Sequence, residues 1–69
     1  MSEQTIFIKE ATSEQNIVKL EEILNKLNGI ERVLVDTADG EVKVEFDDKA
    51  ISKERIITTI MENNFTILH

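Results

Sequence analysis

Apolar residues follow two spacings along this chain, and each spacing predicts one type of secondary structure. At residues 5–9, 30–35 and 42–46 apolar and polar residues alternate, which is the period of a strand with one buried face. At residues 17–27 and 56–61 apolar residues recur every three or four positions, as on the buried stripe of an amphipathic helix. Residues 65–68 are expected to form a further short strand. The predicted order is strand, helix, strand, strand, helix, strand.

Short polar motifs mark where these elements begin and end. Thr12-x-x-Gln15 fits a capping box, so the first helix is expected to begin at Thr12, and Asn28-Gly29 is expected to end it. Asp39-Gly40 stands between two alternating runs, which is the pattern of a β-hairpin. Ser52 is the expected N-cap of the second helix, which should end near residues 63–64.

This order of elements predicts an α+β fold of the ferredoxin-like, or split βαβ, type. Two helices would lie on one face of a four-stranded antiparallel sheet, in the order βαββαβ. A chain of 69 residues has room for one domain, so residues 1–69 are expected to form a single domain that is ordered from about 5 to 68. Because the chain has no cysteine, packing and hydrogen bonds must hold it together without disulfides.

The charge of the chain limits the partners that are expected. Eight Lys and Arg against fourteen Asp and Glu give a net charge of -6, which repels nucleic-acid phosphates and anionic lipid head groups. No apolar run approaches the roughly 18 residues of a membrane span, and the first residues show no signal-peptide pattern. We therefore expect a cytoplasmic protein with no nucleic-acid partner and no membrane insertion.

Four segments resemble the heavy-metal-associated domain of small copper chaperones and metal-pumping ATPases, over residues 5–68. They are Thr5-Ile6-Phe7-Ile8; Leu27-Asn28-Gly29-Ile30-Glu31-Arg32-Val33-Leu34-Val35; Val42-Lys43-Val44-Glu45-Phe46-Asp47; and Ile51-Ser52 with Ile56-Ile57-Thr58-Thr59-Ile60-Met61 and Asn64-Phe65. In that family the first loop carries Met-x-Cys-x-x-Cys and binds soft metal ions. The resemblance puts Ala11 at the Met, Ser13 at the first Cys and Asn16 at the second. A hydroxyl and an amide do not replace thiolates, so it implies a degenerate copper-chaperone homologue whose family metal site is missing.

The same loop is a candidate interaction surface, because members of the family meet their partners around it. The residues of this surface would be Thr12, Ser13, Glu14, Asn16 and Phe65. Two purely structural explanations of these residues are also open. Ser13 to Asn16 fit a polar helix N-terminus that satisfies backbone amides, and Phe65 fits core packing of the last strand.

Catalysis has no candidate residues in this chain. There is no Cys, no Gly-rich phosphate loop and no Ser with a visible base, and the only His is the last residue, His69. Met61 lies on the predicted helical stripe and Met1 at the terminus, so neither is expected to form a site. We expect no enzyme activity and no cofactor.

Three functions stay open at this point. The first is a protein-interaction or regulatory module in metal homeostasis, with a metal-transporting ATPase, a metal-responsive regulator or a second copy as partner. The second is a weak metal carrier that uses oxygen and nitrogen ligands, namely Glu10, Glu14, Asn16 and His69 together with ligands from a partner. The third is a small-molecule-binding regulatory domain.

The sheet face opposite the helices is a further candidate for contacts. Phe7, Leu34 and Leu68 are expected there, with Lys43, Glu45 and Thr66 between them. Three apolar side chains on an open sheet can seed a partner or dimer interface. A monomer or a weak homodimer is therefore expected.

Overall fold

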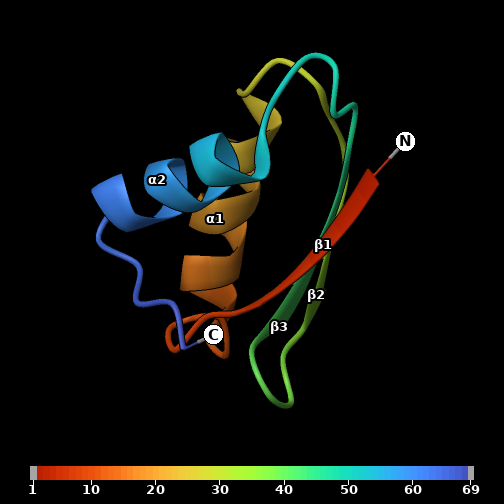
Figure 1. Cartoon of the computed structure of the whole chain (residues 1–69). Helices are drawn as coiled ribbons and strands as arrows, with labels where there is room; N and C mark the ends of the chain where they lie inside the picture. Colours follow the sequence, from red (N-terminus) through yellow and green to blue (C-terminus); the bar gives the residue numbers. More distant parts are fainter. Residues whose placement is uncertain (1, 69) are drawn as a thin grey trace.

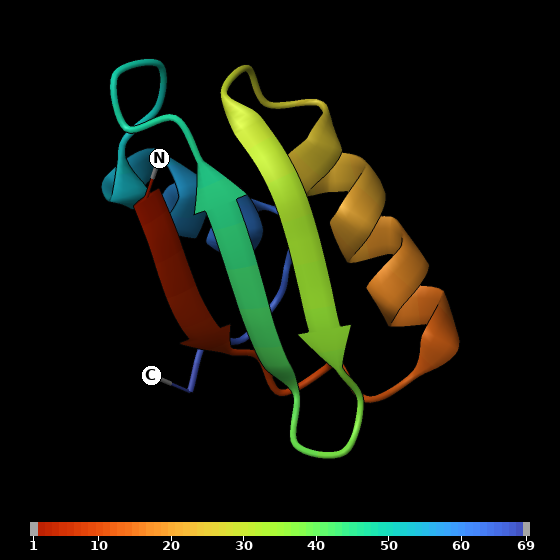
Figure 2. The same ribbon diagram turned by 90° about the vertical axis from the view of Figure 1, so that its right-hand side faces the viewer.

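The computed structural model describes residues 2–68, and they form two helices over one antiparallel sheet. The elements are β1 (Ser2–Phe7), α1 (Glu14–Asn25), β2 (Ile30–Asp36), β3 (Glu41–Phe46) and α2 (Lys53–Glu62). The sheet has the strand order β1-β3-β2, so β3 is central. Figures 1 and 2 show both helices on the same face of this sheet. The predicted layout of two helices on one sheet face is confirmed, but the predicted number of strands is wrong.

The fourth strand expected at residues 65–68 is reduced to one isolated bridge, between Ile8 and Ile67. The sheet therefore has three strands. Within residues 2–68 the last segment contacts β1 only near Phe7 and Lys9, where β1 ends. The Lys9 N–H donates to the Thr66 carbonyl at 2.9 Å, and the Leu68 N–H donates to the Phe7 carbonyl at 2.7 Å. Both bonds lie at the end of β1, so the described part of the segment pairs with β1 only there and not along the rest of the strand.

A side chain from the first loop holds this last segment in place. The Glu10 carboxylate accepts the Thr66 backbone N–H at 2.7 Å on one oxygen and the Thr66 hydroxyl at 2.9 Å on the other. Hydrogen bonds to a charged carboxylate are shorter and stronger than neutral ones. The Glu10–Thr66 contact thus fixes the last segment at this edge, where the described residues lack the full set of backbone hydrogen bonds of a paired strand.

The core lies between the inner face of the sheet and the two helices. Its members with no more than 1% exposure are Ile6, Ile8, Ala11, Leu20, Leu24, Val42, Val44, Phe46, Ile56 and Ile60. The sheet residues among them alternate along β1 and β3, and the helical ones are spaced by four, as the apolar pattern predicts. Fully burying one such large side chain contributes about 1.5–3 kcal/mol.

Three boundaries differ from the sequence prediction, while one is confirmed. β1 begins at Ser2, earlier than the predicted Thr5, because its polar start pairs in register with the end of β3. The N-cap of α1 is Ser13 and not Thr12. This helix ends at Asn25, ahead of the Asn28-Gly29 stop, and a Leu27 N–H to Leu24 carbonyl bond of 3.0 Å tightens the chain after it. Ser52 caps α2, as predicted, and accepts the Arg55 N–H at 3.1 Å.

The predicted hairpin joins β2 to β3 and depends on Gly40. This residue has φ +76°, a left-handed conformation that Gly adopts without steric cost. Its carbonyl accepts the Ile8 N–H at 3.0 Å, so the turn also touches the end of β1. A Cβ at this position would lie 2.5 Å from the Ile8 carbonyl oxygen.

Replacing Gly40 by Ala should therefore lower the free energy of unfolding by about 1–3 kcal/mol, through backbone strain and the clash with Ile8. Urea denaturation followed by circular dichroism measures this loss. Ala38→Gly, in the same exposed turn, is the control and should shift stability by no more than about 0.5 kcal/mol. Equal stability of G40A and the parent would contradict this account of the turn.

The Glu10–Thr66 contact should make stability depend on pH. The hydrogen bond from the Thr66 backbone, followed by the one from its hydroxyl, lowers the pKa of Glu10 below its ordinary 4.5. A lowered folded-state pKa stabilises the fold above pH 4.5, and this stabilisation is lost as the pH falls through the folded-state pKa. Glu10→Gln should melt below the parent at pH 7, and the gap should close on acidification.

Thermal melts of both proteins from pH 7 down to about pH 3 test this expectation. Glu22→Gln is the control, because Glu22 is exposed on α1 and takes no part in the contact. A gap between E10Q and the parent that stays constant over this range would show that the carboxylate charge is not what holds the last segment.

Candidate functional site

The candidate site is the turn between β1 and α1, at residues 8–13, together with the first turn of α1. The turn closes through a hydrogen bond from the Ala11 N–H to the Ile8 carbonyl at 3.2 Å. Ala11, at the family Met position, is fully buried in the core. Thr12, Ser13 and Glu14 are exposed and Asn16 is partly buried. Four of the five residues proposed for this surface therefore lie together at one helix N-terminus.

Ser13 and Asn16 are in direct contact, because Ser13 caps the helix. Ser13 has extended dihedrals, φ -107° and ψ 143°, and its hydroxyl oxygen accepts the Asn16 backbone N–H at 3.3 Å. The two positions that match the family cysteines thus lie in the first turn of the helix, with the Ser13 side chain bonded to the backbone of Asn16. Two thiolates placed there would lie at the positive end of the α1 dipole, which favours their charged form.

The residues actually present offer different chemistry. The Ser13 hydroxyl is a neutral acceptor already used by a backbone amide, and Asn16 adds only a neutral amide group. Glu14, in the first turn of α1, is the acidic residue next to them. The site therefore satisfies the free N–H groups of the helix and presents a short polar surface with one carboxylate.

Phe65 lies in the core and not on the surface. It is 7% exposed, and the Lys19 ammonium lies over its ring, 5.9 Å from the ring centroid. Lys19 is one turn beyond Asn16 on α1, so its positive charge stands beside the candidate surface. Phe65 is thus buried, and the Lys19 side chain lies over its ring.

Sequence reasoning missed two features of this site: the Lys19–Phe65 contact and the Glu10–Thr66 contact. Both join residues far apart in the sequence. The predicted topology contained a signal for the second one, because it places the end of the first strand beside the last segment. No local motif marks either pair.

Of the residues proposed for an oxygen and nitrogen metal site, the structure describes Glu10, Glu14 and Asn16. Both Glu10 oxygens accept hydrogen bonds from Thr66, and His69 lies outside the described residues, as does Met1. Among residues 2–68 no group of three or more His, Cys, Asp and Glu side chains is placed to hold a metal ion. Met61, expected on the buried stripe of α2, is 56% exposed.

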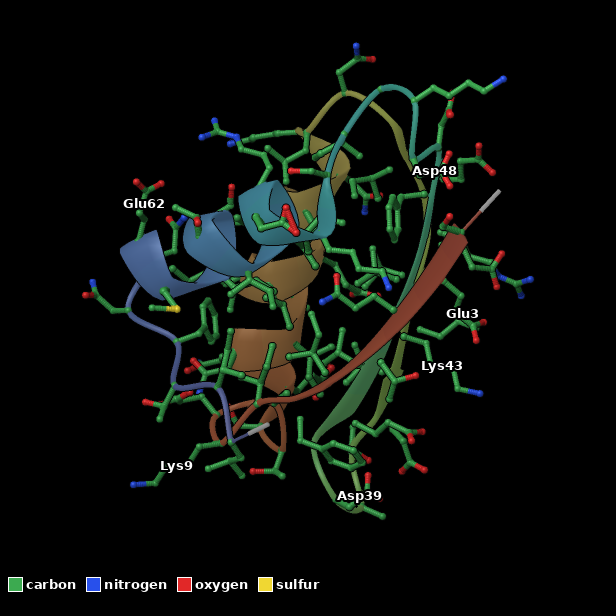
Figure 3. All side chains as sticks on the ribbon, viewed as in Figure 1. Glu3, Lys9, Asp39, Lys43, Asp48 and Glu62 are labelled. Carbon is green, nitrogen blue, oxygen red and sulfur yellow. The ribbon has the colours of Figure 1, made fainter. Side chains whose placement is uncertain are left out.

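The open face of the sheet carries both apolar and charged residues. Leu34 is 41% and Leu68 56% exposed, and Phe7 is partly buried. Lys43 pairs with Leu34 on one side and with Thr5 on the other. The charged side chain of Lys43 on β3 therefore separates Leu34 on β2 from the residues of β1. Figure 3 shows Glu3 and Lys43 pointing away from the helices on this face. The three apolar residues therefore do not form one continuous patch.

The side chains of residues 2–68 enclose no cavity. None of the helices in this part of the chain has the length and apolar character needed to cross a membrane.

Comparison with solved structures identifies proteins of the same fold. The chain superposes on a structure described as the CopZ metallochaperone with a TM-score of 0.89, at 18% identity, over 97% of this chain and 100% of that one. It matches a copper binding domain from HMA7, a P-type ATPase, with a TM-score of 0.86, at 22% identity, over 100% and 96%. It also matches oxidized MerP from Ralstonia metallidurans CH34 with a TM-score of 0.85, at 16% identity, over 99% and 97%.

No protein-family description and no curated protein sequence matches the chain. At these identities the solved structures establish the fold. The resemblance stated from the sequence is confirmed at that level, because the structural neighbours are copper chaperones and heavy-metal-associated domains. The chain therefore has the ferredoxin-like fold of these domains and carries it without a cysteine.

Proposed function

We propose that residues 1–69 act as a single cytoplasmic domain, a degenerate relative of the copper chaperones, that binds another protein in metal homeostasis and catalyses no reaction. One observation carries this proposal. The two positions that match the family cysteines are held by Ser13 and Asn16, and their contact serves to cap α1. The fold around them is that of metallochaperones, with TM-scores of 0.89 and 0.84 to two of them. A fold kept without its ligand atoms favours a role in recognition over metal transfer.

The surface proposed for this recognition is formed by Thr12, Ser13, Glu14 and Asn16, with Lys19 beside them and Phe65 buried beneath Lys19. It combines a carboxylate, an ammonium group and several neutral hydrogen-bonding groups. The partner proposed first is a metal-transporting ATPase, since one of the similar structures is a copper binding domain from a P-type ATPase. A metal-responsive regulator is the second partner to test.

Charge reversal at Glu14 should weaken this binding. We expect that an isotope-labelled chain, titrated with the metal-binding domain of a P-type ATPase from the same cell, shows NMR shifts concentrated at residues 12–16. Glu14→Lys should raise the Kd about tenfold, because it reverses the one carboxylate of that surface.

The chain offers a matched control in Glu54→Lys. Glu54 lies in the first turn of α2, as Glu14 does in α1, so the two changes disturb a helix dipole alike. The control should leave the Kd unchanged. Absence of binding to both an ATPase domain and a metal-responsive regulator, or shifts confined to the open sheet face, would count against the proposed surface.

A second experiment introduces cysteines at the two positions that match the family motif. S13C/N16C should gain tight Cu(I) binding that the parent lacks, because the Ser13–Asn16 contact holds these positions together at the helix N-terminus. Competition against a Cu(I) chelator measures the affinity. The parent should not compete at micromolar Cu(I); if it does, the weak-carrier function gains support over the one proposed here.

The matched control for this experiment is S52C/R55C. Ser52 caps α2 and accepts the Arg55 N–H at 3.1 Å, so this pair reproduces the spacing and the helix position in another loop. We expect it to bind Cu(I) more weakly than S13C/N16C. Equal affinity of the two pairs would mean that the shape of the first loop adds nothing beyond a capped helix.

A further inference from the structure

One edge of the sheet, along β1, has unused backbone groups. The Phe7 carbonyl and the Lys9 N–H face the last segment, whereas the Ile8 N–H faces Gly40. Because backbone groups of alternate residues in an antiparallel strand point to the same side, those of Glu3 and Thr5 point to the open side. Within residues 2–68 no strand pairs with them. Figure 2 shows β1 at this outer edge, with the last segment beside its end.

The two edges of the sheet are protected to different degrees. β2 has a register irregularity between Ile30 and Arg32 and packs against α1, and both features hinder pairing with another strand. β1 pairs with β3 without any shift, and it contains no Pro and no Lys. Its start is fixed by a hydrogen bond from the Ser2 hydroxyl to Asp48 at 2.5 Å. β1 is therefore a regular, ordered edge that is protected by the charge of Glu3 and, at its end, by the last segment, and that leaves the backbone groups of Glu3 and Thr5 open.

A buried polar atom lies on the same strand. The side-chain oxygen of Gln4 is buried and has no hydrogen-bond partner in the described part of the chain. Leaving such an acceptor without a donor costs about 1–3 kcal/mol. The residue as a whole stays partly exposed, so its side chain remains within reach of a group arriving at the edge.

We propose that β1 pairs with β1 of a second copy of this chain, antiparallel across a two-fold axis at Gln4. Glu3 of one copy would exchange backbone hydrogen bonds with Thr5 of the other, and Thr5 with Glu3. Gln4 would lie opposite its own counterpart as a non-hydrogen-bonded pair, with Cβ atoms about 4.5–5.5 Å apart. Each Gln4 amide then has a glutamine oxygen to donate to, which supplies the missing donor.

Competing registers are excluded by the contacts already made. An axis at Thr5 would pair Glu3 with Phe7, but the Phe7 carbonyl already accepts the Leu68 N–H. An axis at Glu3 would place two carboxylates opposite each other, which is destabilising. An axis between two residues would set an outward-pointing residue against an inward-pointing one, which no antiparallel ladder allows. Over residues 2–6 the Gln4 register uses the open groups of Glu3 and Thr5, avoids the pair of carboxylates and leaves the Phe7 carbonyl bonded to Leu68.

The ladder is short, so the dimer should be weak. Interfaces that bury less than about 1,200 Å² in total are typical of transient complexes. Sedimentation and NMR diffusion from about 10 μM to about 1 mM cover the range in which such a dimer forms. We expect the parent to be monomeric at the low end and increasingly dimeric at the high end.

Thr5→Pro is the decisive variant. It removes a donor that the β1–β3 ladder does not use, and Pro is tolerated at such an edge position. It should stay folded by circular dichroism and remain monomeric at 1 mM, roughly the top of this range. Leu34→Ser, on the open sheet face, is the control and should dimerise like the parent. A parent that stays monomeric throughout, or a T5P variant that dimerises equally well, would overturn the proposal.

A cross-linking experiment keeps the test open if T5P fails to fold. Because the chain has no cysteine, Gln4→Cys carries one thiol, which the proposed axis places opposite its counterpart. On oxidation at high concentration Q4C should form disulfide dimers faster than Glu22→Cys, whose thiol is on the exposed face of α1. Faster cross-linking of E22C than of Q4C would contradict the proposed pairing.

Discussion

The central strand β3 is the constraint on which the rest of this structure depends. It pairs with β1 on one side and β2 on the other, and it buries Val42, Val44 and Phe46 completely or nearly so under the helices. A chain of 69 residues without cysteine has no disulfide or thiolate-bound metal to replace this packing. Each of these side chains contributes about 1.5–3 kcal/mol, a large fraction of the stability of a small domain.

In the first loop, the choice between sulfur and oxygen at one side chain decides the chemistry of the helix N-terminus. A thiolate at a helix N-terminus is charged and binds soft metal ions, whereas a serine hydroxyl in that place is neutral and accepts an amide. Ser13 does the latter with the Asn16 N–H. The helix gains a cap of about 1 kcal/mol, and one of its free N–H groups is satisfied without a metal ion.

Local signals in the sequence predicted the features that depend on few residues. The hairpin at Gly40 and the Ser52 cap were found because a left-handed glycine and a capping hydroxyl act within one turn of the chain. The cap of α1 was placed one residue too early, since Thr12 and Ser13 are both good capping residues and no local rule separates them. The apolar periods identified the core for the same reason.

Features that depend on residues far apart were predicted less well. The last segment has the apolar pattern of a strand, but it meets β1 only at the end of β1, which no local pattern reveals. In the sequence Glu10 has no feature that distinguishes it from other loop carboxylates. It holds the last segment by accepting hydrogen bonds from Thr66, 56 positions away. For the candidate site, the sequence placed Ser13 and Asn16 together, but the position of Lys19 over Phe65 needed the packed structure.

The sheet order β1-β3-β2 has a consequence for how the chain assembles. The hairpin of β2 and β3 closes a short stretch of sequence, whereas Ser2 must find Phe46 across most of the chain. Loop closure over that distance costs more entropy than closing the hairpin. β1 is thus expected to dock late, and until it docks the edge of β3 that pairs with it stays exposed to water.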